Sequence, residues 1–446
     1  MGDKRDLSEI PSVNNDYDPY TERDVDSPTN DLESFAHITK GILGTGVLAL
    51  PEGFGFAGGL MAVIYCLLNA FLCTIGMHIL VKDLYMVCKA YHLPVVTYAD
   101  GVKLGANLGP KPFPKLNGFL SMLTNVLIII NQGGILCVYM LFVGVTIEMV
   151  TNTILGKEIS LGFYLLALII PFMLINSIKN LKYLAPVSYF SLGVTVMVLG
   201  MIFYYVFRDD LPDYMETRKL TNDILKLPIF FGTTLFAFTS VAVCVSVENQ
   251  MKTPKHFNLI YDLAIIVLVI LYLSVGFFSY WKWGEDLKSV VILNFPMDEI
   301  PAQTANYLYA LAIFLSLGLN GIVPVKLIME TYILPKLESQ YPILWEYLLR
   351  ISFIAFGLFL AVTIPYIGTV ISLLGAIALS SLTLVFPALL DICWRYQLGY
   401  GPCKFRLLLD ILLITYGMFG LITGVYVNLQ YLYEKMFLEF IKSHDI

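Results

Sequence analysis

Long apolar runs constrain the fold of this chain more than any other feature of its sequence. Crossing a bilayer as a helix takes about 20 mostly apolar residues, and runs of this kind recur along the whole chain. The chain is 57% hydrophobic and only 14% charged, whereas a soluble domain carries about 25% charged residues. We therefore expect an all-α polytopic membrane protein with eleven transmembrane helices. They are expected at 34–54, 59–82, 118–148, 161–177, 183–206, 228–247, 257–281, 303–324, 345–364, 367–390 and 407–429.

The segment before the first span is polar. Residues 1–33 hold ten acidic side chains against three basic ones, a composition that cannot bury a core and predicts a disordered acidic tail. Lys and Arg in short loops favour the cytoplasmic side of a membrane. Fourteen of them fall in loops on the side of the amino terminus and nine on the other side. The sequence thus predicts a cytoplasmic amino terminus and an external carboxyl terminus.

The first span is interrupted by small residues. Its start, HITKGILGTGVLAL at 37–50, carries Gly41, Gly44 and Gly46, and glycine weakens a helix by about 1 kcal/mol relative to alanine. The glycines could seat a neighbouring helix closely, or they could mark an unwound segment that exposes backbone groups to a substrate. A phosphate-binding loop is excluded because the G-K-[ST] ending is missing and no strand precedes the glycines.

A second interruption favours the unwound segment. Many transporters contain two inverted repeats with broken helices at matching positions. The sixth span, five spans after the first, carries Gly232-Thr233-Thr234 and then FAFTS at 236–240. The first span of each set of five therefore contains an interruption by small and polar residues. We expect spans 1–5 at 34–206, an extracellular loop at 207–227, spans 6–10 at 228–390, span 11 at 407–429 and a carboxyl-terminal tail at 430–446.

The two breaks predict a site for a zwitterion. Backbone amides around Thr45 and Gly46 would lie at the positive start of a half-helix and would bind a carboxylate. Carbonyl groups around Phe236 and Phe238, freed by the second break, would accept hydrogen bonds from an ammonium group. Such a site needs no buried full charge, which would be costly to maintain in a membrane. An amino acid is the expected substrate.

Several stretches resemble the proton-coupled amino acid transporters, a branch of the amino acid/auxin permease family. The resemblance implies a five-plus-five inverted repeat with spans 1 and 6 broken and span 11 outside the repeat. It also implies uptake of small neutral amino acids, often with protons, at the plasma membrane or a late endosomal or lysosomal membrane. A histidine at the start of span 1 is tied to proton coupling in these relatives, and His37 stands there; the bland alternative is an interfacial histidine. The similar stretches are HITKGILGTGVLALP at 37–51, NQGGILCVY at 131–139, IKNLKYLAPVS at 178–188, FFGTTLFAF at 230–238, VENQMKTP at 247–254 and IPYIGTVISLLGA at 364–376.

The chain departs from the family where the site is expected. The Glu-Gly pair that the family has after F-A-F is Thr239-Ser240 here, so two hydroxyls replace a carboxylate. Asn320-Gly321 stands in place of Gln-Phe in span 8, and Asn320 becomes a candidate for substrate contact. Further departures are Lys326 for a glutamate and Ile42 for an asparagine. Tyr139 and Gln132 in span 3 could also face the site, although such residues more often join helices.

The sequence predicts a secondary active transporter and leaves two alternatives open. One is a pH-independent uniporter or exchanger, because Thr239 cannot hold a titrating charge. The other is an amino acid sensor that signals through cytoplasmic partners of its tail, against which stands an inert extension. We expect no enzyme activity, no nucleic-acid partner and no cofactor other than protons as a possible coupling ion. No C-x-x-C or H-x-x-x-H spacing suggests a metal site.

Overall fold

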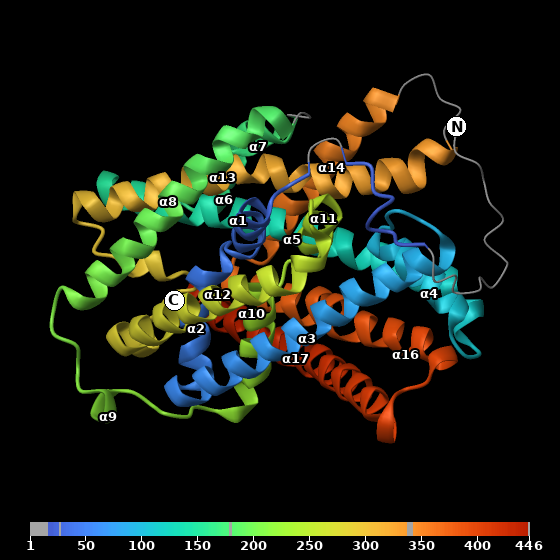
Figure 1. Ribbon diagram of the computed structural model, residues 1–446. Helices are drawn as coiled ribbons and strands as arrows, with labels where there is room; N and C mark the ends of the chain where they lie inside the picture. The colour runs from blue at the N-terminus through green and yellow to red at the C-terminus, as the bar shows by residue number, and fades with distance from the viewer. Residues whose placement is uncertain (1–16, 26–27, 178–180, 337–341, 445–446) are drawn as a thin grey trace.

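The computed structural model describes residues 17–25, 28–177, 181–336 and 342–444. Every regular element among these residues is a helix, and one isolated bridge joins Thr29 to Met251. Figure 1 shows the helices gathered in one bundle, with α1, α2, α10 and α11 near its centre. The all-α fold expected from the sequence is confirmed.

The apolar runs form the long helices. Nine helical stretches in the described part of the chain are long and apolar enough to cross a membrane. They are Gly59–Tyr91, Phe113–Leu155, Phe190–Phe207, Ile224–Gln250, Pro254–Asp286, Ile300–Ile333, Pro342–Thr363, Ile367–Tyr396 and Phe405–Leu438. The first expected span is divided into α1 (Asp31–Ile42) and α2 (Gly46–Ala57), and the fourth into α6 (Leu161–Ala167) and α7 (Ile169–Asn176). These divided spans are too short to count by length, so the expected number of eleven is not confirmed.

The other elements complete the bundle. The remaining α-helices are α3 (Gly59–Tyr91), α4 (Tyr98–Leu108), α5 (Phe113–Leu155), α8 (Leu181–Phe207), α9 (Tyr214–Thr217), α10 (Leu227–Phe238), α11 (Val241–Gln250), α12 (Phe257–Trp283), α13 (Ile300–Ile328), α14 (Pro342–Thr363), α15 (Ile367–Leu374), α16 (Phe386–Leu398) and α17 (Phe405–His444). Short 3-10 turns cover Ile224–Lys226, Pro254–His256, Gly284–Asp286, Val291–Asn294, Leu334–Lys336 and Pro402–Lys404. Single π-helical segments, Met329–Ile333, Gly375–Leu379 and Ser381–Val385, widen the tenth span and the end of the eighth. Helix α4 was not expected, and α17 extends over most of the expected carboxyl-terminal tail.

The breaks in spans 1 and 6 lie where the sequence predicts them. Helix α1 begins with a capping box, in which the Asn30 side chain accepts from the Glu33 amide and the Glu33 carboxylate accepts from the Asn30 amide. It ends at Ile42, and α2 begins at Gly46. In span 6, α10 ends at Phe238 and α11 begins at Val241, with extended backbone between them. The broken-helix architecture is therefore confirmed.

The segment before α1 differs from the expectation of disorder. The Arg23 side chain is buried against Glu248 at the end of α11, and Tyr20 packs on Tyr85 of α3 with ring centroids 4.5 Å apart. Residues 17–25 and 28–30 therefore pack on the helical body, because a buried ion pair and ring contacts compensate for their polar composition. The rest of the expected tail, residues 1–16 and 26–27, lies outside the described residues.

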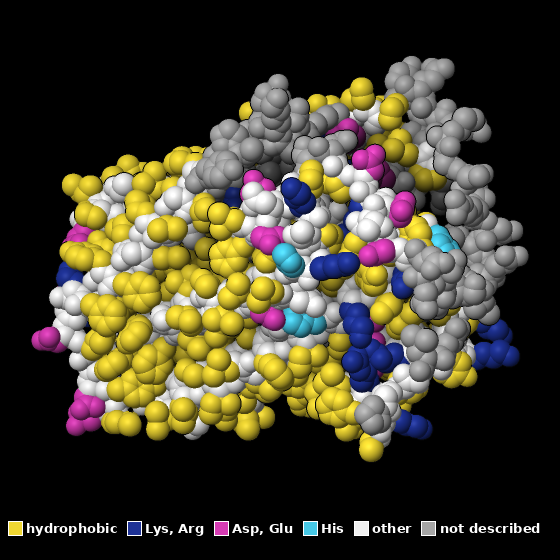
Figure 2. Space-filling view, in the orientation of Figure 1, with side chains coloured by type: hydrophobic (Ala, Val, Ile, Leu, Met, Phe, Trp, Pro, Cys, Tyr) yellow, Lys and Arg dark blue, Asp and Glu magenta, His cyan; other side chains and the backbone are white. Residues whose placement is uncertain are grey.

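The surface suits a bilayer. Large apolar side chains are exposed along several long helices, among them Phe356 and Phe359 of α14 and Phe419 and Tyr426 of α17. Figure 2 shows a broad apolar area with few charged side chains across one part of the molecule, while Lys and Arg gather elsewhere on the same face. An apolar surface of this extent would be unfavourable in water. The chain is a multi-pass membrane protein.

Candidate functional site

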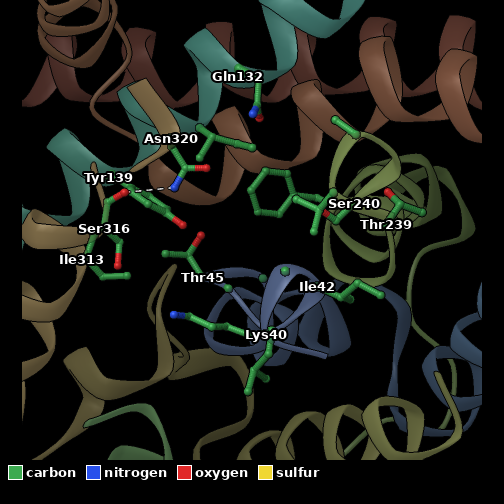
Figure 3. A pocket seen from close by; sticks show the side chains of 18 of the residues that line it. Lys40, Ile42, Thr45, Gln132, Tyr139, Thr239, Ser240, Ile313, Ser316 and Asn320 are labelled. Carbon is green, nitrogen blue, oxygen red and sulfur yellow. Dashed lines mark hydrogen bonds between the residues drawn. The ribbon is translucent and has the colours of Figure 1, made fainter. Parts of the chain in front are cut away.

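A cavity of about 520 Å³ lies between the two broken helices and helices α5, α8 and α13. Nine of the ten residues that the sequence proposed for the site line this cavity. They are His37, Gly41, Gly44, Thr45, Gly46, Phe236, Thr239, Ser240 and Asn320. The structure thus brings the two breaks together around one space (Figure 3). A role of these residues in binding stays a prediction.

The break in span 1 presents the start of a helix to the cavity. The amides of Leu48 and Ala49 donate to the Thr45 carbonyl, each at 3.2 Å. The amides of Gly46 and Val47, which come before them, have no partner within the helix, as is general for a first turn. The Thr45 hydroxyl is buried and has no hydrogen-bond partner among the described residues. This half-helix therefore offers donors and the positive end of its dipole to a ligand.

The three glycines of span 1 differ in how closely they are packed. A Cβ atom at Gly46 would lie 2.8 Å from the Ala237 Cα atom, and one at Gly41 would lie 2.6 Å from Val243 Cγ1. These two glycines let α2 and α1 pack closely on α10 and α11. At Gly44 the nearest atom to an added Cβ is the Tyr139 hydroxyl oxygen at 4.0 Å. Close packing thus explains two glycines, whereas Gly44 borders open space.

The break in span 6 presents the end of a helix. Thr239 and Ser240 adopt φ angles of −125° and −145°, so the helical hydrogen bonds stop here. The Thr239 hydroxyl donates to the Leu235 carbonyl, and the amide of Cys244 donates to the Ser240 carbonyl at 3.0 Å. The carbonyl groups of the last turn of α10 then lack partners from a continuing helix. They form the negative end of the α10 dipole beside the cavity.

Phe238 is placed differently from the other expected residues. Its side chain is fully buried, and its ring lies 5.2 Å from that of Tyr272 in α12. The Tyr272 hydroxyl donates to the Ile42 carbonyl at 3.1 Å, and the same carbonyl at the end of α1 accepts from the Gly44 amide at 2.9 Å. Phe238 therefore does not line the cavity. It anchors the break in span 6 to the same tyrosine that holds the break in span 1.

Helices α8 and α13 supply a polar wall of which the sequence predicted only Asn320. The hydroxyls of Ser191 and Ser316 lie 3.2 Å apart, and Thr195 donates to the Ser191 carbonyl at 2.8 Å. The Asn320 side-chain amide donates to the Ser316 carbonyl at 3.1 Å (Figure 3). A signal was present, because each helix carries two polar residues four positions apart, which places them on one face.

Of the four other residues that the sequence analysis singled out, three line the cavity and one does not. Tyr139, Gln132 and Ile42 line the cavity. Lys326 does not; its ammonium lies 3.8 Å from the Glu330 carboxylate, and its side chain is 67% exposed. Within the described ranges, no cluster of three or more His, Cys, Asp or Glu residues could hold a metal ion.

The sequence predicted a site without a buried full charge. The structure differs, because one charged side chain lines the cavity. The Lys40 side chain, in the last turn of α1, lines the cavity and is half-buried. The sequence analysis assigned no role to Lys40. His37 itself is exposed and lines the same cavity, one helical turn before Gly41.

The model of the family described as transmembrane amino acid transporter protein matches residues 28–430. The chain belongs to this family. It is 30% identical over 419 residues to the proton-coupled amino acid transporter-like protein pathetic of Drosophila melanogaster, covering 92% of this chain and 87% of that protein. It is 26% identical over 403 residues to vacuolar amino acid transporter 3 of Saccharomyces cerevisiae, covering 85% of this chain and 54% of that protein. The family resemblance found in the sequence is confirmed, and the chain is an amino acid transporter rather than an enzyme.

The fold also matches a solved transporter structure. Mhp1, a nucleobase-cation-symport-1 family transporter in a closed conformation with bromovinylhydantoin bound, aligns with a TM-score of 0.54. The alignment covers 95% of both chains at 12% sequence identity. At this identity the match concerns the fold alone.

Proposed function

We propose that this transporter carries small neutral amino acids by alternating access and that protons drive the uptake. The observation that carries the proposal is the meeting of two helix ends in one cavity. The start of α2 is a donor site for a carboxylate, and the end of α10 is an acceptor site for an ammonium group. An α-amino acid carries both groups on one carbon atom.

The cavity walls support a substrate with a small, uncharged side chain. The carboxylate would accept from the amides of Gly46 and Val47 and from the Thr45 hydroxyl. The ammonium group would donate to the last carbonyls of α10, around Phe236. The polar wall of Ser191 and Ser316 lies on another side of the same space. Ile42 and the Phe236 ring give apolar surface for a short side chain.

Alternating access would move two groups of helices past each other. Spans 1, 2, 6 and 7 form one group, which is joined by the bond from the Tyr272 hydroxyl to Ile42 and by the Asn69 side-chain amide donating to the Thr234 hydroxyl at 2.7 Å. Spans 3, 4, 8 and 9 form the other group. The cavity lies between the groups, as rocking of one against the other requires.

Proton coupling is supported by the name of the Drosophila relative and by the place of His37 in the cavity lining, since histidine is a side chain that commonly takes up and releases protons. We place the amino terminus in the cytoplasm and the protein in the plasma membrane or a late endosomal or lysosomal membrane. The yeast relative is named for the vacuole, which favours an internal membrane. The pH-independent uniporter and the tail-signalling sensor are the alternatives.

Uptake of labelled alanine, glycine, proline and leucine into proteoliposomes tests the proposal. It is measured at about pH 5.5 and about pH 7.5, on either side of the ordinary histidine pKa. Uptake of the small amino acids should rise at acidic pH, and His37→Ala should remove that rise. Uptake that is equal at both pH values would establish the uniporter or exchanger instead. Binding of amino acids without any uptake would support the sensor.

A further inference from the structure

Lys40 has no partner within the part of the protein that the structure describes. No hydrogen bond or ion pair among those residues involves its ammonium group, although the group lines the cavity. Figure 3 shows the side chain extending from α1 on the side of the cavity where Thr45 and Ile313 lie. A lone ammonium group within a membrane protein is costly unless it meets water or a counter-ion. The cavity is the place where such a counter-ion can enter.

Acidic side chains on α1 are already engaged. The Asp31 carboxylate accepts from the Thr253 hydroxyl and lies 2.7 Å from His256 Nδ1. The Glu33 carboxylate accepts from the Asn30 amide at the start of the helix. Both lie in the first turn of α1, whereas Lys40 lies in its last turn.

The helices that pack on α1 offer no free acid either. Glu248 of α11 forms an ion pair with Arg23, and Asp262 of α12 lies 2.9 Å from His78 Nε2. Two further acids, Glu52 of α2 and Glu148 of α5, are not lining residues. The described lining of the cavity therefore contains Lys40 and His37 but no Asp or Glu.

The charges of the cavity are consequently one-sided. The start of α2 adds a partial positive charge to that of Lys40. The carbonyl ends of α1 and α10 oppose them, and each carries only a partial charge. A ligand with a carboxylate compensates both positive groups, whereas an amine without a carboxylate meets an unpaired ammonium group.

We propose that Lys40 is the counter-ion of the substrate carboxylate, so that this cavity requires a carboxylate and excludes substrates of net positive charge. The inference rests on the proposed function and specifies the substrate class of that site. The amino group is then the dispensable half of the substrate. A carboxylate without the amine binds, and an amine without the carboxylate does not.

Direct binding to the purified full chain tests this with three probes: alanine, propionate and ethylamine. Propionate should compete with labelled alanine, whereas ethylamine and lysine should not. Lys40→Met should weaken binding of alanine and propionate about tenfold or more, the effect of losing one charged hydrogen bond. Lys40→Arg should retain most of the binding, and Lys326→Met is the matched control, since Lys326 lies outside the cavity. Circular dichroism and melting temperature show whether each variant is folded.

The outcomes separate this inference from the proposed function. Ethylamine competing as well as propionate, or a folded Lys40→Met variant that binds alanine like the unaltered protein, would overturn the role of Lys40 and leave amino acid transport standing. If Lys40→Met does not fold, the ratio of propionate to ethylamine binding in Lys40→Arg and in the unaltered chain decides. Binding of propionate without binding of alanine would uphold the carboxylate site and overturn the proposed function.

Discussion

Arg23 and Glu248 form a buried ion pair across 225 residues of sequence, with Arg23 Nη1 and Glu248 Oε1 3.1 Å apart. Their side chains are only 5% and 7% exposed. Arg23 also donates to the Glu248 carbonyl and to the Pro94 carbonyl, at 3.0 and 3.1 Å. The pair thus fixes the segment before α1 to the end of α11 and to the loop after α3. The ion pair therefore holds the broken span 1, through the segment that precedes α1, to the end of the broken span 6.

Arg23→Met should destabilise the protein by about 3–5 kcal/mol, because it leaves the Glu248 carboxylate buried without a counter-ion. The thermal midpoint in detergent should fall, and limited proteolysis should cut the segment before α1 faster. Adding Glu248→Leu to this variant should restore much of the lost stability, since replacing both partners by apolar groups removes the unpaired charge. A single variant that melts like the unaltered protein would show that the pair contributes nothing.

A glycine comparison separates close packing from open space in span 1. Gly46→Ala should cost about 1–3 kcal/mol by overpacking, because the new methyl group meets the Ala237 backbone. Gly44→Ala has room for its methyl group and should leave the melting temperature unchanged. It should instead reduce the affinity for the larger amino acids, since it narrows the cavity. Equal melting temperatures for both variants would contradict the packing assigned to Gly46.

Thr45→Val should weaken substrate binding up to about tenfold and leave stability nearly unchanged. The change removes a hydroxyl that has no partner among the described residues while it keeps the shape of the side chain. Thr234→Val is the matched control, because the Thr234 hydroxyl accepts from Asn69 and lies outside the cavity lining. The control should lower the melting temperature and keep the substrate affinity. Reversed effects of the two variants would remove Thr45 from the binding site.

Much of this architecture follows from local sequence. Apolar runs predict the long helices, and small or polar residues within them predict the interruptions at Gly44 and at Thr239-Ser240. These features are readable because helix formation and helix breaking depend on neighbouring residues. The nine lining residues were found for the same reason, since most of them flank one of the two breaks.

The residues that were misplaced depend on tertiary packing. Phe236 lines the cavity and Phe238 does not, because two positions along a helix turn the side chain to another face. The Lys40 side chain lines the cavity for a similar reason, because its position on the helix directs it there. Amino-acid composition does not predict that this side chain faces the cavity. Arg23 and Glu248 are distant in sequence, so their ion pair gives no local signal. An acidic, polar segment therefore predicts disorder even where one buried arginine fixes it.

The contact between Asp31 and His256 makes the start of α1 sensitive to pH. The hydrogen bond from Thr253, and then that from His256, hold the pKa of the Asp31 carboxyl below its ordinary value of 3.8. Because the pKa is lowered in the folded state, the contribution to stability is present above the ordinary value and is lost as the pH falls through the folded one. Asp31→Asn should remove this acid dependence and loosen the first turn of α1 already at neutral pH. Hydrogen exchange of the α1 amides, at pH values on both sides of the ordinary Asp pKa, measures this acid dependence. The control is Asp209→Asn, since the Asp209 side chain is exposed. Exchange that depends equally on pH in both variants would show that Asp31 does not hold the helix.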